Sequence, residues 1–182
     1  MNWKKTLKIL GFIVLTIIVF IAGLIGYGYY HMKGKYAVNE EKYPHYIGKI
    51  ESDKAIRTDD FQLCKGGRMY GFYSSAAPKI YRKSKLEFKK TIKTSFKDQN
   101  YKDNGYLSLR FNMNCKGKTG NLIITELNSD LGVTTLNSNL VDQLVSLSLQ
   151  EENWQTVSDT DVNYYMYLLF KIENGTITEI LP

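Results

Sequence analysis

A run of about twenty residues without a charged side chain lies near the N-terminus and limits the possible folds more than any other feature. The run extends from Ile9 to Tyr30, and lysines stand on both sides of it. A helix rises about 1.5 Å per residue, so a helix of this length spans the roughly 30 Å of hydrocarbon in a bilayer. Tyr27 and Tyr29 fall where an interfacial aromatic belt would lie. The run therefore predicts a transmembrane helix over residues 9–30.

The competing interpretation is a cleaved signal peptide. Such peptides have an apolar region of about 7–15 residues that ends at a small-x-small cleavage site. The run in this chain is longer, and Ala22-Gly23-Leu24 matches the cleavage pattern poorly. No cysteine follows the run, which excludes a lipoprotein. We therefore favour an uncleaved signal-anchor.

The lysines around the run predict its orientation. Lys4, Lys5 and Lys8 favour a cytoplasmic N-terminus, and their cluster is denser than Lys33 and Lys35, which oppose it. This topology places the protein in the inner (cytoplasmic) membrane as a single-pass protein with its C-terminal part in the periplasm. The expected parts are a cytoplasmic N-terminus (1–8), a transmembrane helix (9–30), a stalk (31–60) and an extracytoplasmic α+β domain (61–182).

The charge of the chain is unevenly distributed. The formal net charge is +6, which would ordinarily suggest nucleic acid as a partner. Residues 1–35 hold five lysines and no acid, and residues 36–118 hold 18 basic against 9 acidic side chains. Residues 119–182 hold one basic against nine acidic side chains. Because the basic half would lie outside the cytoplasm, we expect no nucleic-acid partner.

The chain has two cysteines, Cys64 and Cys115, both in the part expected outside the cytoplasm. In an oxidising compartment the even count favours one disulfide, although two unrelated buried thiols are the alternative. There is no Cys-x-x-Cys, so the sequence contains neither a redox motif of that type nor a cysteine-rich zinc site.

A capping box predicts a helix over residues 84–98. In Ser84-Lys85-Leu86-Glu87 the serine oxygen would accept a hydrogen bond from the backbone amide of Glu87. Phe88, Ile92 and Phe96 recur every four residues and form its buried stripe. A second stripe consists of Lys85, Lys89, Lys93 and Lys97. We interpret this basic stripe first as a solvated face, and second as a contact for anionic lipid or another acidic surface.

Alternating apolar and polar residues predict an antiparallel sheet in the second half. Tyr106–Cys115 reads as a half-buried strand, and 121–127 returns as its partner after a glycine-bearing turn. A helix is expected near 138–150. Residues 162–172 form the third strand, and the Asn174-Gly175 hairpin signal predicts a fourth strand over 176–181. Residues 61–82 suggest one or two further short strands. The fold class is α+β: one transmembrane helix, then a small antiparallel sheet with packed helices.

The sequence offers no catalytic constellation. His31 and His45 are the only histidines, and both precede the predicted domain, so a Ser/His/Asp or Cys/His site is disfavoured. Asp159 and Asp161 could bind a cation, but two carboxylates alone are weak evidence. Arg110 and Asn112 fall on the predicted wet face of a strand, where solvation explains them. We therefore expect no enzyme, no metal site and no cofactor.

From about residue 105 to 173 the chain resembles the C-terminal domain of TonB-type energy transducers (the TonB/TolA-type periplasmic domains), as a divergent branch. The resemblance is carried by 105–111, by the turn ending in Gly117, by the amphipathic helix, by Trp154 and by 162–172. It implies a TonB-like core at about 105–182. It also implies that a short peptide of an outer-membrane transporter adds as a strand to the open edge of the third strand, while the anchor couples to an inner-membrane motor.

The resemblance also implies a partner-binding edge, although core packing is the alternative for its tryptophan. The residues of this edge are Trp154, Tyr165, Tyr167 and Leu169. The chain departs from the family in three ways: it lacks a long proline-rich segment, it lacks the intramembrane serine and histidine, and the strand 176–181 could cover the binding edge.

The leading interpretation is a membrane-anchored, non-catalytic protein-binding or structural module of the cell envelope. The first alternative is a short-reach energy transducer for outer-membrane transport, with an outer-membrane transporter and an inner-membrane motor as partners. The second is an envelope enzyme or an anionic-lipid-binding protein.

Overall fold

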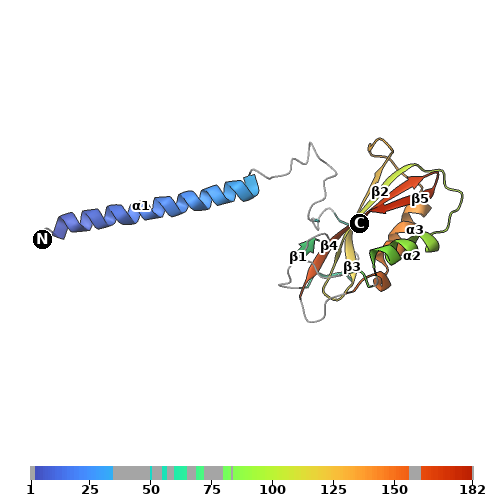
Figure 1. Ribbon diagram of the computed structural model, residues 1–182, viewed down its shortest axis with the longest axis horizontal. Helices are drawn as coiled ribbons and strands as arrows, with labels where there is room; N and C mark the ends of the chain where they lie inside the picture. The colour runs from blue at the N-terminus through green and yellow to red at the C-terminus, as the bar shows by residue number, and fades with distance from the viewer. Residues whose placement is uncertain are drawn as a thin grey trace. The chain divides into compact units, whose positions relative to one another are not determined.

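The computed structural model of the chain describes residues 3–34, 50, 55–56, 60–64, 69–71, 80–82, 84–155 and 161–181 (Figure 1). The chain divides into two units, Met1–Tyr46 and Ile47–Pro182, and each is described by itself.

The first unit holds one long helix. α1 runs over Trp3–Tyr29, and a π-helical turn, η1, continues it over Tyr30–Gly34. Within the described residues, it is the one helix long and apolar enough to cross a membrane, which is compatible with a single-pass anchor or with a signal sequence. The helix begins six residues before the predicted span at Ile9.

The second unit contains a five-stranded sheet. The order of the strands is β1-β4-β2-β3, and β5 also pairs with β4. The strands are β1 (Met69–Gly71), β2 (Gly105–Met113), β3 (Thr119–Leu127), β4 (Asn163–Glu173) and β5 (Thr176–Leu181). The four strands expected between residues 106 and 181 are all present, with bounds shifted by one or two residues.

The expectation of a purely antiparallel sheet is wrong in one strand. β1 runs parallel to β4, with Met69 opposite Asn163 and Gly71 opposite Tyr165. A parallel pair needs a long connection, which residues 72–162 supply. Local alternation carries no information about strand direction, so the sequence pattern could not predict this pairing. The fold is therefore α+β with a mixed sheet.

The β4–β5 hairpin has the predicted Asn-Gly turn. Asn174 and Gly175 both have positive φ, at 49° and 73°, as a type I′ turn requires. A side chain at Gly175 would lie 2.3 Å from the backbone oxygen of Tyr101. Glycine is thus needed at position 175 both for the turn and for the close approach of the backbone at Tyr101.

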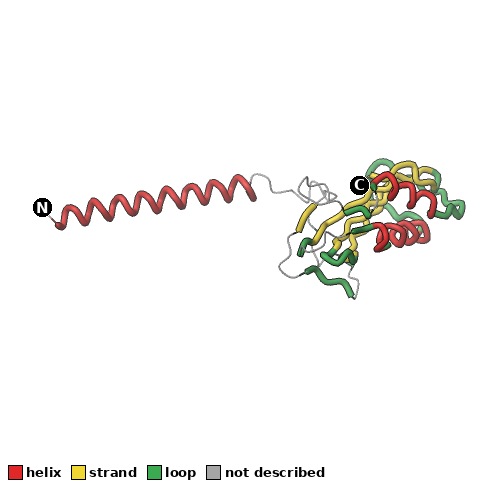
Figure 2. Tube along the Cα trace, turned by 60° about the horizontal axis from the view of Figure 1, so that its bottom comes forward, coloured by secondary structure: helices red, strands yellow, loops and turns green. Residues whose placement is uncertain are grey.

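One face of the sheet is covered by helices. α2 (Lys85–Ser95) and α3 (Ser138–Leu149) lie next to each other against this face (Figures 1 and 2). Ser84 caps α2 as predicted, since its side-chain oxygen accepts from the backbone amide of Glu87 at 3.1 Å. The core consists of alternate strand residues and of the apolar stripes of both helices. Its fully buried members include Leu107, Leu109, Phe111, Met113, Tyr164, Met166, Leu168, Phe170, Ile92, Leu140 and Leu144.

A disulfide attaches an upstream segment to the end of the sheet. Cys64 and Cys115 are bonded, and 51 positions of sequence separate them. The amide of Asn163 makes two hydrogen bonds with the backbone of Cys64, at 3.0 and 3.2 Å. Asn114 Nδ2 donates to the carbonyl oxygen of Gln62 at 2.9 Å. The segment 60–64 is therefore held by one covalent bond and by two buried asparagines.

Part of the predicted stalk belongs to the folded unit. Ile50 is buried, and the backbone of Ile56 exchanges two hydrogen bonds with Leu122 of β3, at 2.7 and 3.0 Å. The other residues expected in the stalk beyond Gly34, apart from Ala55 and Asp60, lie outside the described residues.

Candidate functional site

The edge of β4, where the resemblance implied peptide binding, already has strand partners. β1 pairs with residues 163–165 and β5 pairs with residues 169–173, while β2 occupies the other side over residues 164–172. Neither β1 nor β5 pairs with the three β4 residues between these two stretches, 166–168. The expectation of an open edge along β4 is therefore wrong.

Three of the four predicted edge residues share the sheet face opposite the helices. Tyr165, Tyr167 and Leu169 are each partly exposed there. The hydroxyl of Tyr165 lies over Gly71, at 2.6 Å from where a side chain would begin. These residues thus belong to a partly covered face of the sheet, and two of them lie where β4 has strand partners on both sides.

Trp154, the fourth predicted edge residue, lies in the core instead. It is 1% exposed and packs against Tyr81, Phe88 and Phe111 with ring centroids 5.1–5.6 Å apart. Its indole nitrogen donates to the Ser148 carbonyl oxygen at 3.1 Å. Burial raises the pKa of the neighbouring Tyr81 phenol far above its ordinary value, so this cluster stays neutral. Trp154 therefore stabilises the fold and does not present itself to a partner.

Two further sequence expectations concern single polar residues. Asn112, assigned to the wet face of its strand, is only 3% exposed, so that expectation is wrong. Asn112 lies opposite Gly120 on β3, and the Phe61 ring packs against Gly120. The segment 60–64, which contains Phe61, therefore shields this end of the sheet from water. Arg110 is partly exposed. Within the described residues no three His, Cys, Asp or Glu side chains could together hold a metal ion, and Asp159 lies outside them.

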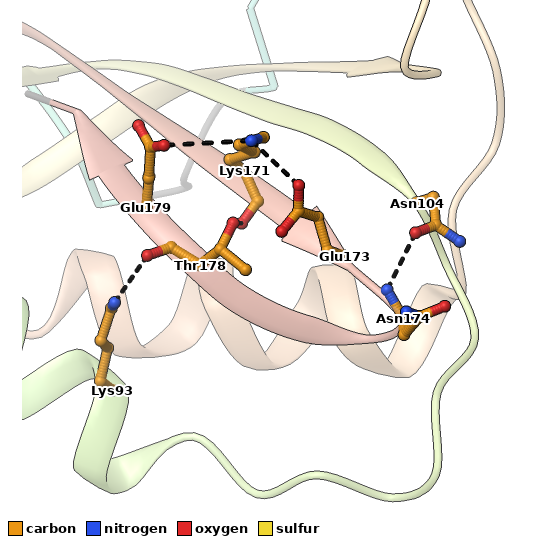
Figure 3. Close-up of polar contacts among 7 residues, drawn as sticks. All are labelled: Lys93, Asn104, Lys171, Glu173, Asn174, Thr178 and Glu179. Carbon is orange, nitrogen blue, oxygen red and sulfur yellow. Dashed lines mark hydrogen bonds and ion pairs between the residues drawn. The ribbon is translucent and has the colours of Figure 1, made fainter.

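The predicted basic face of α2 borders a groove along β5. The prediction of a helix over 84–98 is wrong at its C-terminal end: α2 ends at Ser95 and Phe96 is extended, so Lys97 lies beyond the helix. We define the lysine face as Lys85, Leu86, Lys89, Lys90 and Lys93, which all belong to α2. The groove has a volume of about 640 Å³ and lies between four of these residues and the segment 178–181. Lys93 Nζ donates to the Thr178 carbonyl oxygen at 2.8 Å and thereby joins α2 to β5 (Figure 3).

The one charged residue of β5, Glu179, lies near a lysine of β4. Lys171 Nζ lies 2.9 Å from a Glu173 carboxylate oxygen and 3.9 Å from one of Glu179 (Figure 3). The hydrogen bond that Lys171 donates to Glu173, together with the negative charge of that carboxylate, raises the pKa of Lys171. Glu179, the one acidic residue lining the groove, thus has a cation beside it, so the lysine face dominates the charge around the groove.

The sequence predicts a loop containing Asp130 and Gly132 before the helix near 138–150, and in the structure this loop presents apolar side chains to solvent. We define the Leu131 turn as residues 128–133, directly after β3. Asn128 Oδ1 accepts from the backbone amides of Asp130 and Gly132, at 3.0 and 2.9 Å, and Leu127 pairs with Val133. Leu131 is 59% exposed and Val133 is 75% exposed. The hydrogen bonds hold two apolar side chains outward at an edge of the sheet.

The backbone of Leu131 is strained. Four non-glycine residues in the described part have positive φ; three are asparagines, which adopt this conformation readily, and the fourth is Leu131 at 64°. Such a conformation costs a branched residue about 1–2 kcal/mol. The Leu131 side chain is exposed, so its burial does not offset this cost. The Asp130-Leu131-Gly132 run resembled an ordinary loop in the sequence, so no local signal revealed the strain.

We expect Leu131→Asn to raise the free energy of unfolding of the folded unit by about 1 kcal/mol, because asparagine relieves the strain. The measurement is pulse proteolysis of the full chain across a urea series. Leu86→Asn is the matched control: Leu86 is equally apolar and 77% exposed, but helical. There the same change should lower stability by a few tenths of a kcal/mol. A loss of stability in Leu131→Asn would contradict the strain argument.

Comparison of this chain with protein-family models, with curated proteins and with solved structures finds no match.

Proposed function

We propose that this protein is a single-pass anchor protein of the inner membrane whose periplasmic domain is a non-catalytic protein-binding or structural module of the cell envelope. The observation that carries the proposal is the Leu131 turn: an ordered turn that holds apolar side chains in solvent beside an edge strand. Exposed apolar side chains grouped at one place are typical of protein contact sites. The partner is an envelope protein with an apolar pocket that receives Leu131 and Val133.

The edge strand next to the turn supports the same assignment. On its outer side β3 has backbone contacts at Leu122, with Ile56, and at Glu126 and Leu127, with Thr134 and Val133. Ile56 is also exposed, so apolar side chains stand at both ends of this edge. A partner that contacts Ile56, Leu131 and Val133 together would bury all three apolar side chains.

The short-reach energy transducer is the second candidate function, and the sheet disfavours it. In this reading a transporter peptide adds as a strand to β4, but β1 and β5 already pair with eight of the eleven β4 residues on that side. Peptide capture there would require β5 to detach. Co-purification of inner-membrane motor subunits together with outer-membrane receptors would favour this candidate over ours.

The proposal is tested by photo-crosslinking in native membranes. With a photoreactive residue at position 133 of the full chain, we expect one discrete crosslinked protein. The same residue at the exposed position 152, on the short 3-10 turn after α3, should give none. Adding Leu131→Asn should lower the yield at 133 about tenfold, because removing an apolar anchor from an interface costs more than about 1 kcal/mol. Since this variant is expected to be more stable, unfolding would not explain the loss. An unchanged yield would contradict the proposal.

A further inference from the structure

The lysine face of α2 combines a cluster of cations with an exposed leucine, and the proposed protein contact uses neither. Lys85, Lys89, Lys90 and Lys93 lie within nine positions of α2, and the one carboxylate of α2, Glu87, accepts a hydrogen bond from the Ser84 cap. Leu86 stands among these lysines on the helix surface, three and four positions before Lys89 and Lys90, and is 77% exposed. A cationic helix face with an exposed leucine is typical of segments that lie at a membrane surface.

The groove beside this face has apolar walls and a basic rim. Leu86, Ile180 and Leu181 contribute apolar surface, and Lys89, Lys90 and Lys93 surround it. Such a site suits a molecule that is anionic at one end and apolar at the other, which describes a phospholipid.

Two observations favour a lipid over an extended acidic peptide. Lys93 already occupies the Thr178 carbonyl oxygen on the outer edge of β5, so an added strand would lose this acceptor. In addition, only fifteen residues lie between Gly34, at the end of η1, and the buried Ile50. A chain of that length spans at most about 55 Å, so a membrane that holds α1 is always within this reach of the domain.

We propose that the lysine face docks on anionic phospholipid head groups of the membrane that holds α1, with Leu86 inserted between them. This inference uses the anchor of the proposed function but not the Leu131 turn, so either can fail without the other. Docking through the lysine face would orient the folded unit on the bilayer. The Leu131 turn belongs to a different element and is not part of this docking surface. Phosphate groups would pair with the ammonium groups, and acyl chains would contact the groove wall.

The test places a polarity-sensitive fluorophore at either of two threonines on α2, in the full chain in nanodiscs. Thr94 lines the groove, whereas Thr91, one turn earlier, lines a separate cavity together with Gln150 and Asn153. Because Cys64 and Cys115 are bonded, a cysteine introduced at 94 or 91 is labelled selectively. With phosphatidylglycerol present we expect a blue shift at 94 and none at 91, and in pure phosphatidylcholine we expect none at either. High salt should reverse the shift.

Lys89→Gln with Lys90→Gln should lower the ratio of docked to free protein roughly fivefold for each lysine removed. Three outcomes would overturn the proposal: no shift in anionic nanodiscs, an equal shift in neutral ones, or an equal shift at position 91. A shift produced by soluble polyglutamate but not by anionic lipid would also overturn it, in favour of an acidic protein partner.

Discussion

Replacing both Cys64 and Cys115 by serine is expected to lower the free energy of unfolding of the folded unit by about 4 kcal/mol. The two residues are separated by 51 positions, and a closed loop of that length removes about this much chain entropy from the unfolded state. That loss is a large fraction of the stability of an ordinary domain, about 5–15 kcal/mol. The measurement is pulse proteolysis of the full chain in detergent across a urea series.

Reductant supplies the internal control for this experiment. Reduced wild-type protein should fall to the stability of the double serine variant, and that variant should not respond to reductant. Thiol labelling without reductant should show no free thiol in the wild type. Two labelled thiols would mean that the bond does not form in the cell, and wild-type protein would then be no more stable than the variant.

The second large effect is expected from Trp154→Ala, with a loss of about 3–5 kcal/mol, the usual cost of truncating a buried aromatic side chain. The change empties the space between Tyr81, Phe88 and Phe111 and removes the donor for the Ser148 carbonyl oxygen. Urea unfolding of the full chain measures the loss.

Trp154→Phe is the matched variant, because it keeps a ring in the cluster and removes only the indole N–H and part of the volume. We expect it to cost about 2 kcal/mol, mainly through the unpaired carbonyl group. If Trp154→Ala retained wild-type stability but lost crosslinking from position 133, Trp154 would be a partner-contact residue and its assignment to the core would be wrong.

The start of α2 and the start of β5 show how well local sequence patterns predicted the elements. Ser84 caps α2 because a serine oxygen satisfies a helix amide that has no other partner, and this need is local. The Asn174-Gly175 turn follows equally from local conformational preference. The alternating core faces of β2 and β4 also agree with the sequence pattern.

The candidate surfaces were predicted much less well. The lysine face follows from helical spacing, and the structure adds the groove beside it. The sequence predicts a loop at the Leu131 turn but not its exposed apolar side chains or its strained backbone, because exposure and backbone strain are properties of the folded chain. Tyr165 and Leu169 were expected at an open edge, yet β1 and β5 cover that edge.

The sequence by itself determined the apolar helix, the helix cap, the hairpin and the alternating strands, because each depends on neighbours within a few residues. Only the tertiary structure decided which strands pair, that β1 runs parallel to β4, and that Trp154 and Asn112 are buried. These outcomes depend on contacts between residues far apart in the chain, such as Cys64 with Asn163 and Phe61 with Gly120. Spacing along the sequence carries no record of such contacts.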